Sequence, residues 1–382
     1  AEDGASTYAP GAMGNAFRVS TYVSDLAIYD QIQVLRGPSG LIQGTGEPGG
    51  TINMIRKKPT KDNQYNFQTT LSSWGAVRQT ADLSRQLNEQ GTLRGRAVLV
   101  GDAGHGYSSD IDKRNGTIYA VVEADLAAST KIDVGAMYGY NKYTPDVWGF
   151  PLTTDGKDTG LSRKKYFGAD WNEYKTKKSN VFAELSHAFN ENWKADLKLN
   201  YTKTTSKNKF AFVSAPSTGW DGVSDFRING GTGSFYDNTA DEYSIDSKVS
   251  GKFHLLERTH EVFLGASWHK SKFKSDYSAT YISPSTVPAN FSPKDIAEPD
   301  WSVKDAQDHN FRFSYYEAAF NLGARLELTK TVHALLGGRY THYDYDSWSW
   351  YTVWYGDDSP DPGNPYTSTY RKNKFIPYAG LT

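Results

Sequence analysis

Strict alternation of apolar and polar residues, repeated from Gln64 onward, constrains the fold more than any other feature of this sequence. In the segment TIYAVVEADL, alternate positions from Ile118 to Leu126 are apolar, whereas Thr117 and Glu123 lie on the opposite face. The segments WKADLKLNYT and EYSIDSKVSGKF repeat this pattern. A period of two is that of a half-buried β-strand. About eleven such strands of about ten residues, followed by a truncated one, are therefore predicted.

The connections between these segments alternate between short and long. Short turns are predicted at 88–92, 127–130, 190–192, 255–258 and 328–331, and longer polar connections at 102–114, 142–177, 207–241, 276–311 and 344–371. Long loops at one end of the sheet, with apolar residues outside and charged residues inside, are typical of an outer-membrane barrel. Closure is expected because an open sheet edge in lipid leaves backbone groups unpaired.

The predicted fold is thus all-β, a transmembrane antiparallel β-barrel. A soluble β-sandwich or propeller is the alternative, although its charged face would point outward. Four aromatic residues near strand ends, Phe189, Trp193, Phe253 and Tyr343, are expected to belong to the aromatic girdles at the membrane interfaces.

Composition excludes several functional classes. A net charge of −1, from 42 basic and 43 acidic residues, gives no indication of nucleic-acid binding. The chain has no cysteine, which removes disulfides, thiol nucleophiles and cysteine-based zinc sites. The eight histidines form neither H-x-x-x-H nor H-E-x-x-H, so neither a metal site nor an enzyme is expected. No apolar run approaches the roughly 18 residues of a membrane helix, whereas barrel strands give a far weaker hydropathy signal.

Gly44, Gly46 and Gly49 match the G-x-G-x-x-G spacing of a dinucleotide-binding turn. That motif requires a helix directly after the glycines. Pro48 disfavours a helical conformation for the residue before it, and the short segment between Gly49 and Pro59 leaves no room for a crossover helix. A nucleotide site is therefore not expected.

The segment IYDQIQVLRGPSGLIQGTGEPGGTINMIRKKPT, from Ile28 to Thr60, is followed at once by the alternating strands. It resembles the end of the plug domain of TonB-dependent outer-membrane receptors, and most of all the ferric-siderophore receptors of the hydroxamate and pyoverdine type. The piece FIPYAG near the end also fits such receptors. The resemblance implies that residues 1–62 are the C-terminal part of a plug and that residues 63–382 are the first half of the barrel.

A plugged transporter of this kind has about 22 strands, and about twelve are expected here. In such plugs, glycines allow a small sheet and tight turns to pack inside the lumen. The resemblance implies a charged contact between Arg36 and the barrel wall, with glutamate partners beyond Thr382. It assigns a structural role in the plug to Arg36, Gly37, Pro38, Gly44, Gly46, Pro48, Gly49, Gly50 and Asn53.

The resemblance also implies a function. Such receptors lie in the outer membrane of Gram-negative bacteria and import a ferric siderophore, energised by TonB. Iron(III) is cargo, and no intrinsic cofactor is expected. Outer-membrane lipid and lipopolysaccharide, and a phage or bacteriocin, are further expected partners. The TonB box is absent, and the ends AEDGASTYAP and NKFIPYAGLT indicate an internal piece of a longer protein. The alternatives are a receptor for haem or cobalamin, or a passive aromatic-lined porin.

A ferric chelate needs aromatic faces to pack against and arginine or tyrosine groups to bind its oxygens. On the plug, spacing places Phe17 and Arg18 near the apex that such receptors raise towards the ligand. For each aromatic in the long connections, packing within its own loop or at the lipid interface is the alternative. The aromatic candidates in these connections are Trp148, Trp171, Trp220, Trp301, Trp348, Trp350 and Tyr355.

Overall fold

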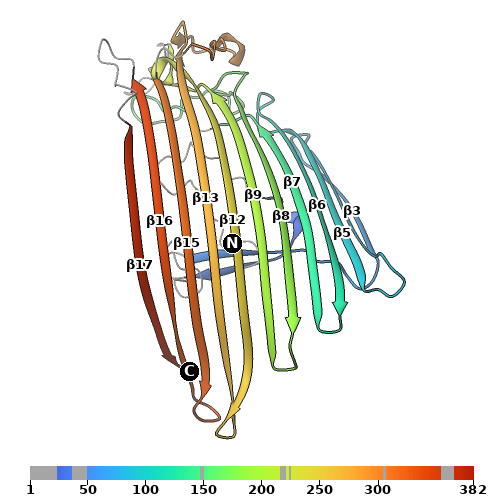
Figure 1. Cartoon of the computed structure of the whole chain (residues 1–382). Coiled ribbons are helices and arrows are strands. Elements are labelled where there is room, and N and C mark those ends of the chain that lie inside the picture. The colour runs from blue at the N-terminus through green and yellow to red at the C-terminus, as the bar shows by residue number, and fades with distance from the viewer. Residues whose placement is uncertain are drawn as a thin grey trace.

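The chain forms a twelve-stranded antiparallel sheet whose strands follow one another in chain order, with three small strands of the long connections set apart in another sheet (Figure 1). The computed structural model describes residues 24–36, 50–146, 150–215, 221–222, 225–303, 307–353 and 365–382. The strands of this sheet are β3 (Gln64–Leu71), β4 (Val77–Gln86), β5 (Leu93–His105), β6 (Asp112–Ala127), β7 (Thr130–Tyr143), β8 (Glu173–Ala188), β9 (Trp193–Phe210), β12 (Thr232–Leu255), β13 (Arg258–Tyr281), β15 (Gln307–Glu327), β16 (His333–Val353) and β17 (Tyr366–Leu381).

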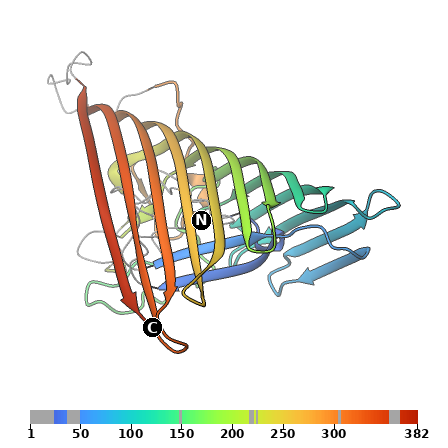
Figure 2. The ribbon, with the colours of Figure 1, turned by 60° about the horizontal axis from the view of Figure 1, so that its bottom comes forward.

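The sheet is curved, and a two-stranded hairpin lies against its concave side (Figure 2). Short turns gather at one end of the strands and the long connections at the other (Figure 1). The predicted strand number is confirmed, and so is the alternation of short and long connections from β6 onward; the connection between β5 and β6 is as short as the turn before β5. Within the described ranges, no helix has both the length and the apolar character required to cross a membrane.

The two faces of the sheet differ in chemistry. In β6, Ile118 and Val122 are exposed on one face, whereas Tyr119 and Val121 are buried on the other. Because side chains alternate along a strand and are aligned across a ladder, these assignments extend to neighbouring strands. We call the face that carries Ile118 the outward face. Other exposed apolar residues on it are Val134, Val181, Leu199, Ile245, Leu264, Phe320 and Leu336.

The opposite face, which we call the plug-facing wall, can be followed along one unbroken cross-strand row. Phe182 of β8 packs against the hairpin segment, together with Ile28 and Met54. The row that begins at Phe182 continues through Asn200, Ser244, His269 and Glu317 to Tyr343. Side chains in this row, and those two residues away along each strand, therefore point to the hairpin side of the sheet.

Several strands are longer than the alternation predicts. β12 and β13 contain 24 residues each, so the connections expected at 207–241 and 276–311 are partly strand. Likewise, β5 and β6 leave only residues 106–111 between them. The reason is visible in β13, where outward positions change from apolar to Lys270, Lys272 and Lys274. Backbone pairing continues there, but the apolar signal on which the sequence prediction relied has ended.

The hairpin begins with the short 3-10 helix η2 (Leu26–Ile28) and consists of β1 (Tyr29–Arg36) and β2 (Gly50–Arg56). Its strands pair antiparallel, with Arg36 opposite Gly50. The glycine-rich segment thus leads into a strand rather than a helix, which excludes the nucleotide-binding alternative. Gly50 has a φ of +148°, and a Cβ there would lie 2.6 Å from the Leu35 carbonyl oxygen. Close backbone approach is therefore the reason for this glycine.

The connections after β7, β9 and β13 fold together into a cap at one end of the sheet. The cap contains the small strands β10 (Val213–Ser214), β11 (Phe226–Ile228) and β14 (Thr286–Val287) and the 3-10 helices η3 (Asn229–Gly231) and η4 (Pro293–Asp295). Its buried core includes Phe167, Phe226, Ile228, Val287, Phe291 and Ile296. The described parts of these long connections thus share a hydrophobic core of their own.

Candidate functional site

The hairpin is attached to the plug-facing wall first by hydrophobic packing. Ile28, at the end of η2, is fully buried among Val98, Tyr119 and Phe182 of the wall. The Tyr119 hydroxyl donates a hydrogen bond of 2.7 Å to the carbonyl oxygen of Lys57. Burying an isoleucine side chain stabilises by about 1.5–3 kcal/mol, so this contact fixes the position where the hairpin meets the sheet.

A second attachment joins Asp25, just before η2, to Arg78 of β4. Both guanidinium Nη atoms donate to the carboxylate, at 2.8 and 2.7 Å. The amide of Ala27 donates to the same carboxylate at 2.8 Å. Burial opposes ionisation of Asp25, but the hydrogen bonds from Arg78 and Ala27 outweigh it and hold the pKa of the carboxyl below its usual range. A bidentate arginine–carboxylate pair fixes geometry as well as charge.

The residues after β2 form the third and most strongly charged attachment. Lys57 Nζ lies 2.8 Å from Asp82, and Arg96 donates to both oxygens of the same carboxylate at 2.7 and 2.8 Å. Lys58 Nζ lies 2.7 Å from Asp133 and 3.0 Å from Glu184. Burial would lower the pKa of Lys58, but the hydrogen bond to Asp133 and the charge of Glu184 raise it overall.

Arg56, the last residue of β2, completes this run of three cations. Its guanidinium carbon lies 4.2 Å above the centre of the Phe182 ring, and Nη2 donates to Asn200 at 3.1 Å. The motif INMIRKKP therefore places each of its cations against a different part of the wall. We call Arg56, Lys57, Lys58 and their partners Asp82, Asp133 and Glu184 the basic latch.

The plug–wall charge contact was expected at Arg36 instead. Arg36 is exposed at the end of β1, and none of the ion pairs among described residues includes it. Its expected partners lie beyond Thr382, so its role stays a prediction. The basic latch was not predicted, because a run of lysine and arginine after a strand is usually a strand end that is exposed to solvent. The acids of the plug-facing strand positions, such as Glu123 and Asp133, could have signalled it.

Beyond the hairpin, toward the end that carries the long connections, the plug-facing wall becomes aromatic. Phe273 and Phe313 lie 5.2 Å apart between ring centres, and Phe313 stacks on Tyr345 at 5.8 Å. Tyr315 and Tyr343 lie 5.0 Å apart. We call Phe273, Phe311, Phe313, Tyr315, Tyr343 and Tyr345 the aromatic band. Such a surface can pack against the faces of a bulky organic ligand.

A polar pair borders the aromatic band on the side nearer the short turns. Arg339 Nη2 lies 2.8 Å from Glu317, and the Tyr315 hydroxyl donates to the other oxygen of that carboxylate at 2.6 Å. Arg339 and Glu317 are both almost fully buried. The wall thus combines aromatic faces with hydrogen-bonding groups, the combination that binding sites for oxygen-rich chelates require.

Two of the predicted ligand residues, Trp171 and Trp301, are brought together in the cap. Their rings lie 5.6 Å apart in an edge-to-face arrangement. The indole N–H of Trp171 donates to the Ile296 carbonyl oxygen at 2.9 Å, and that of Trp301 donates to Glu298 at 2.8 Å. Both polar atoms are thus used within the cap, which favours the packing role that we considered as the alternative.

Trp348 and Trp350 lie on β16, in register with Arg312 and Asn310 of β15. They are an odd number of residues from Tyr343, so they belong to the outward face and not to the plug-facing wall. The Arg312 guanidinium carbon lies 6.0 Å from the centre of the Trp348 ring. Conversely, Tyr343 was expected in an interface girdle, and this expectation is wrong because its side chain faces the hairpin side.

The remaining predicted residues divide in two groups. Asn53 of β2 donates to Gln33 at 3.1 Å, within the hairpin. Phe17, Arg18, Gly37, Pro38, Gly44, Gly46, Pro48, Gly49, Trp148, Trp220 and Tyr355 lie outside the described residues. In the described part of the chain, no group of three or more histidine or acidic side chains is arranged to hold a metal ion.

The aromatic band was not predicted, because ligand contacts were expected only in the plug and in the long connections. The signal was present in FRFSYY, where Phe311, Phe313 and Tyr315 occupy alternate positions. These positions belong to the plug-facing wall, which elsewhere carries charged side chains. Large rings therefore stand here where charges would be expected. Such a reversal near the loop end of a strand indicates an aromatic inner wall.

Comparison with known proteins agrees with this architecture. Residues 136–382 match the family model described as "TonB dependent receptor-like, beta-barrel". The chain belongs to the TonB-dependent receptor family. This family consists of transport receptors of the Gram-negative outer membrane, which confirms the predicted fold and location.

Two relatives of this TonB-dependent receptor chain are 30% identical to it. The ferric-pyoverdine receptor PbuA of a Pseudomonas species aligns with 88% of the chain and 41% of its own length. The ferripyoverdine receptor of Pseudomonas aeruginosa aligns with 84% and 39%, respectively. A solved structure of a Pseudomonas aeruginosa receptor bound to ferripyoverdine superposes with a TM-score of 0.82 at 26% identity, over 100% of the chain and 48% of that receptor. The chain therefore spans less than half the length of these relatives.

Proposed function

We propose that this chain is part of an outer-membrane receptor that imports a ferric siderophore, of the class that contains pyoverdine-type chelates. The observation that carries the proposal is the 30% identity to two ferric-pyoverdine receptors over at least 84% of the chain. Iron(III) enters as cargo inside its chelator, and the protein performs no bond-breaking step. Residues 1–62 are the end of the plug, and residues 63–382 are the first part of the barrel.

The proposed ligand surface is the aromatic band. It lies nearer to the loop end of the wall than the basic latch, so a chelate that enters between the loops meets it before the hairpin. Rings such as Phe313 and Tyr343 offer apolar faces, and the Tyr315 hydroxyl and Arg339 provide polar groups beside them. The cap, with Trp171 and Trp301 at its base, forms the rim of this entrance.

Transport requires the plug to change its contacts with the wall. We propose that TonB supplies the force and that the basic latch determines which part of the plug stays attached. Lys57 and Lys58 hold the end of the plug to three acids of the wall. Movement of the plug is then expected away from this attached end, while the contacts of Asp25, Lys57 and Lys58 with the wall are kept.

The haem, cobalamin and porin alternatives have less support. A passive porin needs an open lumen, whereas the hairpin here is fixed to the plug-facing wall by several ion pairs. Haem and cobalamin receptors share the plugged fold, but the relatives at 30% identity are both named for ferric pyoverdine. A bacteriocin is a further proposed partner, because one superposable structure is a receptor in complex with pyocin S2, with a TM-score of 0.84.

An uptake experiment tests the proposal. The full-length protein is expressed in a Gram-negative strain that lacks its own siderophore receptors, and cells receive radioactive iron bound to individual ferric pyoverdines and hydroxamates. Accumulation with one chelate, abolished when TonB is deleted, is the expected result. Uptake that persists without TonB would support a porin, and growth on haem or cobalamin alone would redirect the assignment within the family.

A further inference from the structure

A pocket of about 610 Å³ lies on the plug-facing wall near the short turns, at the end opposite the aromatic band. Its principal side chains lie an even number of residues from a member of the row between Phe182 and Tyr343, or directly opposite such a position. They therefore face the hairpin side of the sheet. We call this the turn-end pocket and define it by Lys194, Lys248, Phe263, Arg325, Leu335 and Tyr378.

The floor of the turn-end pocket is apolar, because a glycine allows an aromatic ring to lie against the sheet. Phe263 of β13 is directly opposite Gly323 of β15. A Cβ at position 323 would lie 2.2 Å from a ring carbon of Phe263, so an alanine there would displace the ring. Leu335 and Tyr378 also line the pocket, and Lys248 Nζ lies 5.5 Å from the centre of the Phe263 ring. The pocket thus offers a ring and further apolar side chains to an organic ligand.

Positive charge surrounds this floor. Of the described residues that line the pocket, four are cations and two are acids. Lys252 lies 3.6 Å from Glu261. None of the ion pairs between described residues includes Lys194, Lys248 or Arg325. The turn-end pocket therefore attracts anions.

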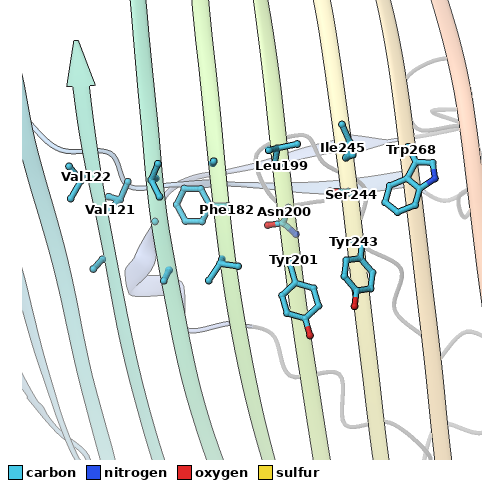
Figure 3. Close-up of a pocket in the computed structure, with 16 residues that line it drawn as sticks. Val121, Val122, Phe182, Leu199, Asn200, Tyr201, Tyr243, Ser244, Ile245 and Trp268 are labelled. Atoms are coloured by element: carbon cyan, nitrogen blue, oxygen red, sulfur yellow. The ribbon is translucent and has the colours of Figure 1, made fainter. Parts of the chain in front are cut away.

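The hairpin meets the wall between the aromatic band and the turn-end pocket. Arg56 of the hairpin contacts Phe182 and Asn200, which Figure 3 shows side by side on neighbouring strands. The cross-strand row that contains these two residues continues onto β13. From that row, Phe263 lies about 20 Å along β13 toward the short turns, whereas Phe273 of the aromatic band lies about 13 Å in the other direction. The two surfaces are therefore on opposite sides of the hairpin.

The direction of transport orders these two surfaces. The short turns of outer-membrane barrels are at the periplasmic end and the long loops at the external end. A ligand that enters between the long connections meets the aromatic band first, and it reaches the turn-end pocket only after it has passed the hairpin. Both surfaces combine aromatic faces with cationic groups, which together bind an organic ligand that carries negatively charged oxygens.

We propose that the turn-end pocket is an exit site, which binds the ferric chelate after it has passed the plug and before it leaves for the periplasm. The ring of Phe263 packs against the organic part of the chelate, and Lys194, Lys248 and Arg325 bind its oxygens. Binding there lowers the free energy of the chelate beyond the plug and so favours forward movement over return. This inference rests on the proposed import of a ferric siderophore.

Photo-crosslinking of the full-length receptor in transporting cells tests the exit site directly. A benzophenone amino acid replaces Leu335, whose side chain faces the pocket, or, as the matched control, Leu336, whose side chain faces outward. Cells that import ferric pyoverdine are irradiated with and without TonB, and adducts of the chelator are detected by mass spectrometry. An adduct is expected only at position 335 and only when TonB is present.

The outcomes separate this inference from the proposed function. Active import without an adduct at position 335, equal adducts at the two positions, or a cross-link from position 335 only to another segment of the receptor would overturn the exit site. Failure of the wild-type receptor to import any ferric chelate would overturn the proposed function itself, and the exit site with it.

Two variants separate exit from entry. Lys248→Gln with Arg325→Gln is expected to lower the saturating rate of iron uptake by about fivefold. Binding of ferric pyoverdine to energy-depleted cells should stay unchanged, because the pocket lies about 33 Å from the aromatic band along β13. Lys330→Gln, which removes an exposed charge at a neighbouring short turn, is the matched control and should alter neither quantity.

Gly323→Ala, which displaces the Phe263 ring, keeps the test decisive if the charge variant does not fold. It should also slow uptake without weakening external binding. An unchanged uptake rate in the folded variants, or a loss of external binding in step with uptake, contradicts the exit site.

Discussion

Arg78 of the barrel wall donates two hydrogen bonds to Asp25 of the plug segment, of 2.8 and 2.7 Å. Fifty-three positions separate them in the chain, yet the pair defines how the first described turn of the plug sits on β4. Together with the basic latch, it indicates that this part of the plug is docked on the wall by charge as well as by the burial of Ile28.

The Asp25–Arg78 pair should respond to pH only in the acid range. The pKa of Asp25 is lowered from 3.8 in the folded state. The contribution of the ion pair to folding stability is therefore fully present above the unfolded pKa, and it is lost as pH falls through the lowered folded value. We expect the plug contact to be unchanged between pH 7 and pH 5 and to weaken only below about pH 4. A ¹³C NMR titration of the labelled Asp25 carboxyl measures this, with Asp25→Asn as the reference. A midpoint near or above 5 would contradict the account.

Loss of Lys58 from the basic latch should be costly because it removes the cation between two buried carboxylates. Asp133 and Glu184 have side chains that are 5% and 10% exposed, and both pair with Lys58, whereas the second cation of Glu184, Lys198, lies farther away at 3.9 Å. We expect Lys58→Ala to destabilise the folded full-length protein by about 1–3 kcal/mol in chemical unfolding. Lys157→Ala, which breaks a solvent-exposed pair with Asp155, should cost less than about 1 kcal/mol. Equal effects of the two substitutions would mean that Lys58 is merely a surface lysine.

Gly50 should not tolerate a side chain. A Cβ would lie 2.6 Å from the Leu35 carbonyl oxygen, in a backbone conformation that disfavours other residues. We expect Gly50→Ala to disrupt the hairpin at a cost above about 1 kcal/mol, measured as faster hydrogen exchange in β1 and β2. Gly101→Ala is the control, because no neighbouring atom lies within 4 Å of its added Cβ. Protection of the hairpin that is equal in both variants would remove the steric argument.

The aromatic band and the outward tryptophans should differ in their effect on ligand binding. Tyr343 and Phe313 face the hairpin side of the sheet, whereas Trp348 faces outward. We expect Tyr343→Ala and Phe313→Ala each to weaken binding of the transported ferric chelate by about tenfold. Trp348→Ala should leave the affinity unchanged. Isothermal titration of the full-length variants makes the comparison, and a loss confined to Trp348→Ala would reverse the assignment of faces.

The alternation in segments such as TIYAVVEADL was sufficient to predict the sheet, its order and its two faces, because lipid and lumen require opposite chemistry at successive residues. The alternation did not predict the strand ends, where the outward face no longer has to be apolar. In β13, Lys270, Lys272 and Lys274 replace the apolar residues, so the strand continues without the pattern that revealed it.

The candidate site was harder to predict than the fold for a related reason. The aromatic band lies within strands, and only the register between β13, β15 and β16 brings Phe273, Phe313 and Tyr345 together. No single segment contains that information. Trp171 and Trp301 show the opposite error. Their position in polar loops predicted ligand binding, whereas their contacts are made within the cap.

The central claim is that the full-length protein binds a ferric siderophore on the aromatic band. The most direct measurement is a titration of the purified protein with a panel of ferric pyoverdines and hydroxamates, followed by tryptophan and tyrosine fluorescence, with iron-free chelators and maltodextrins as controls. The account predicts saturable quenching by one ferric chelate, lost or displaced to higher concentration in Tyr343→Ala. No fluorescence quenching by any chelate of the panel, or equal binding by Tyr343→Ala, would contradict it.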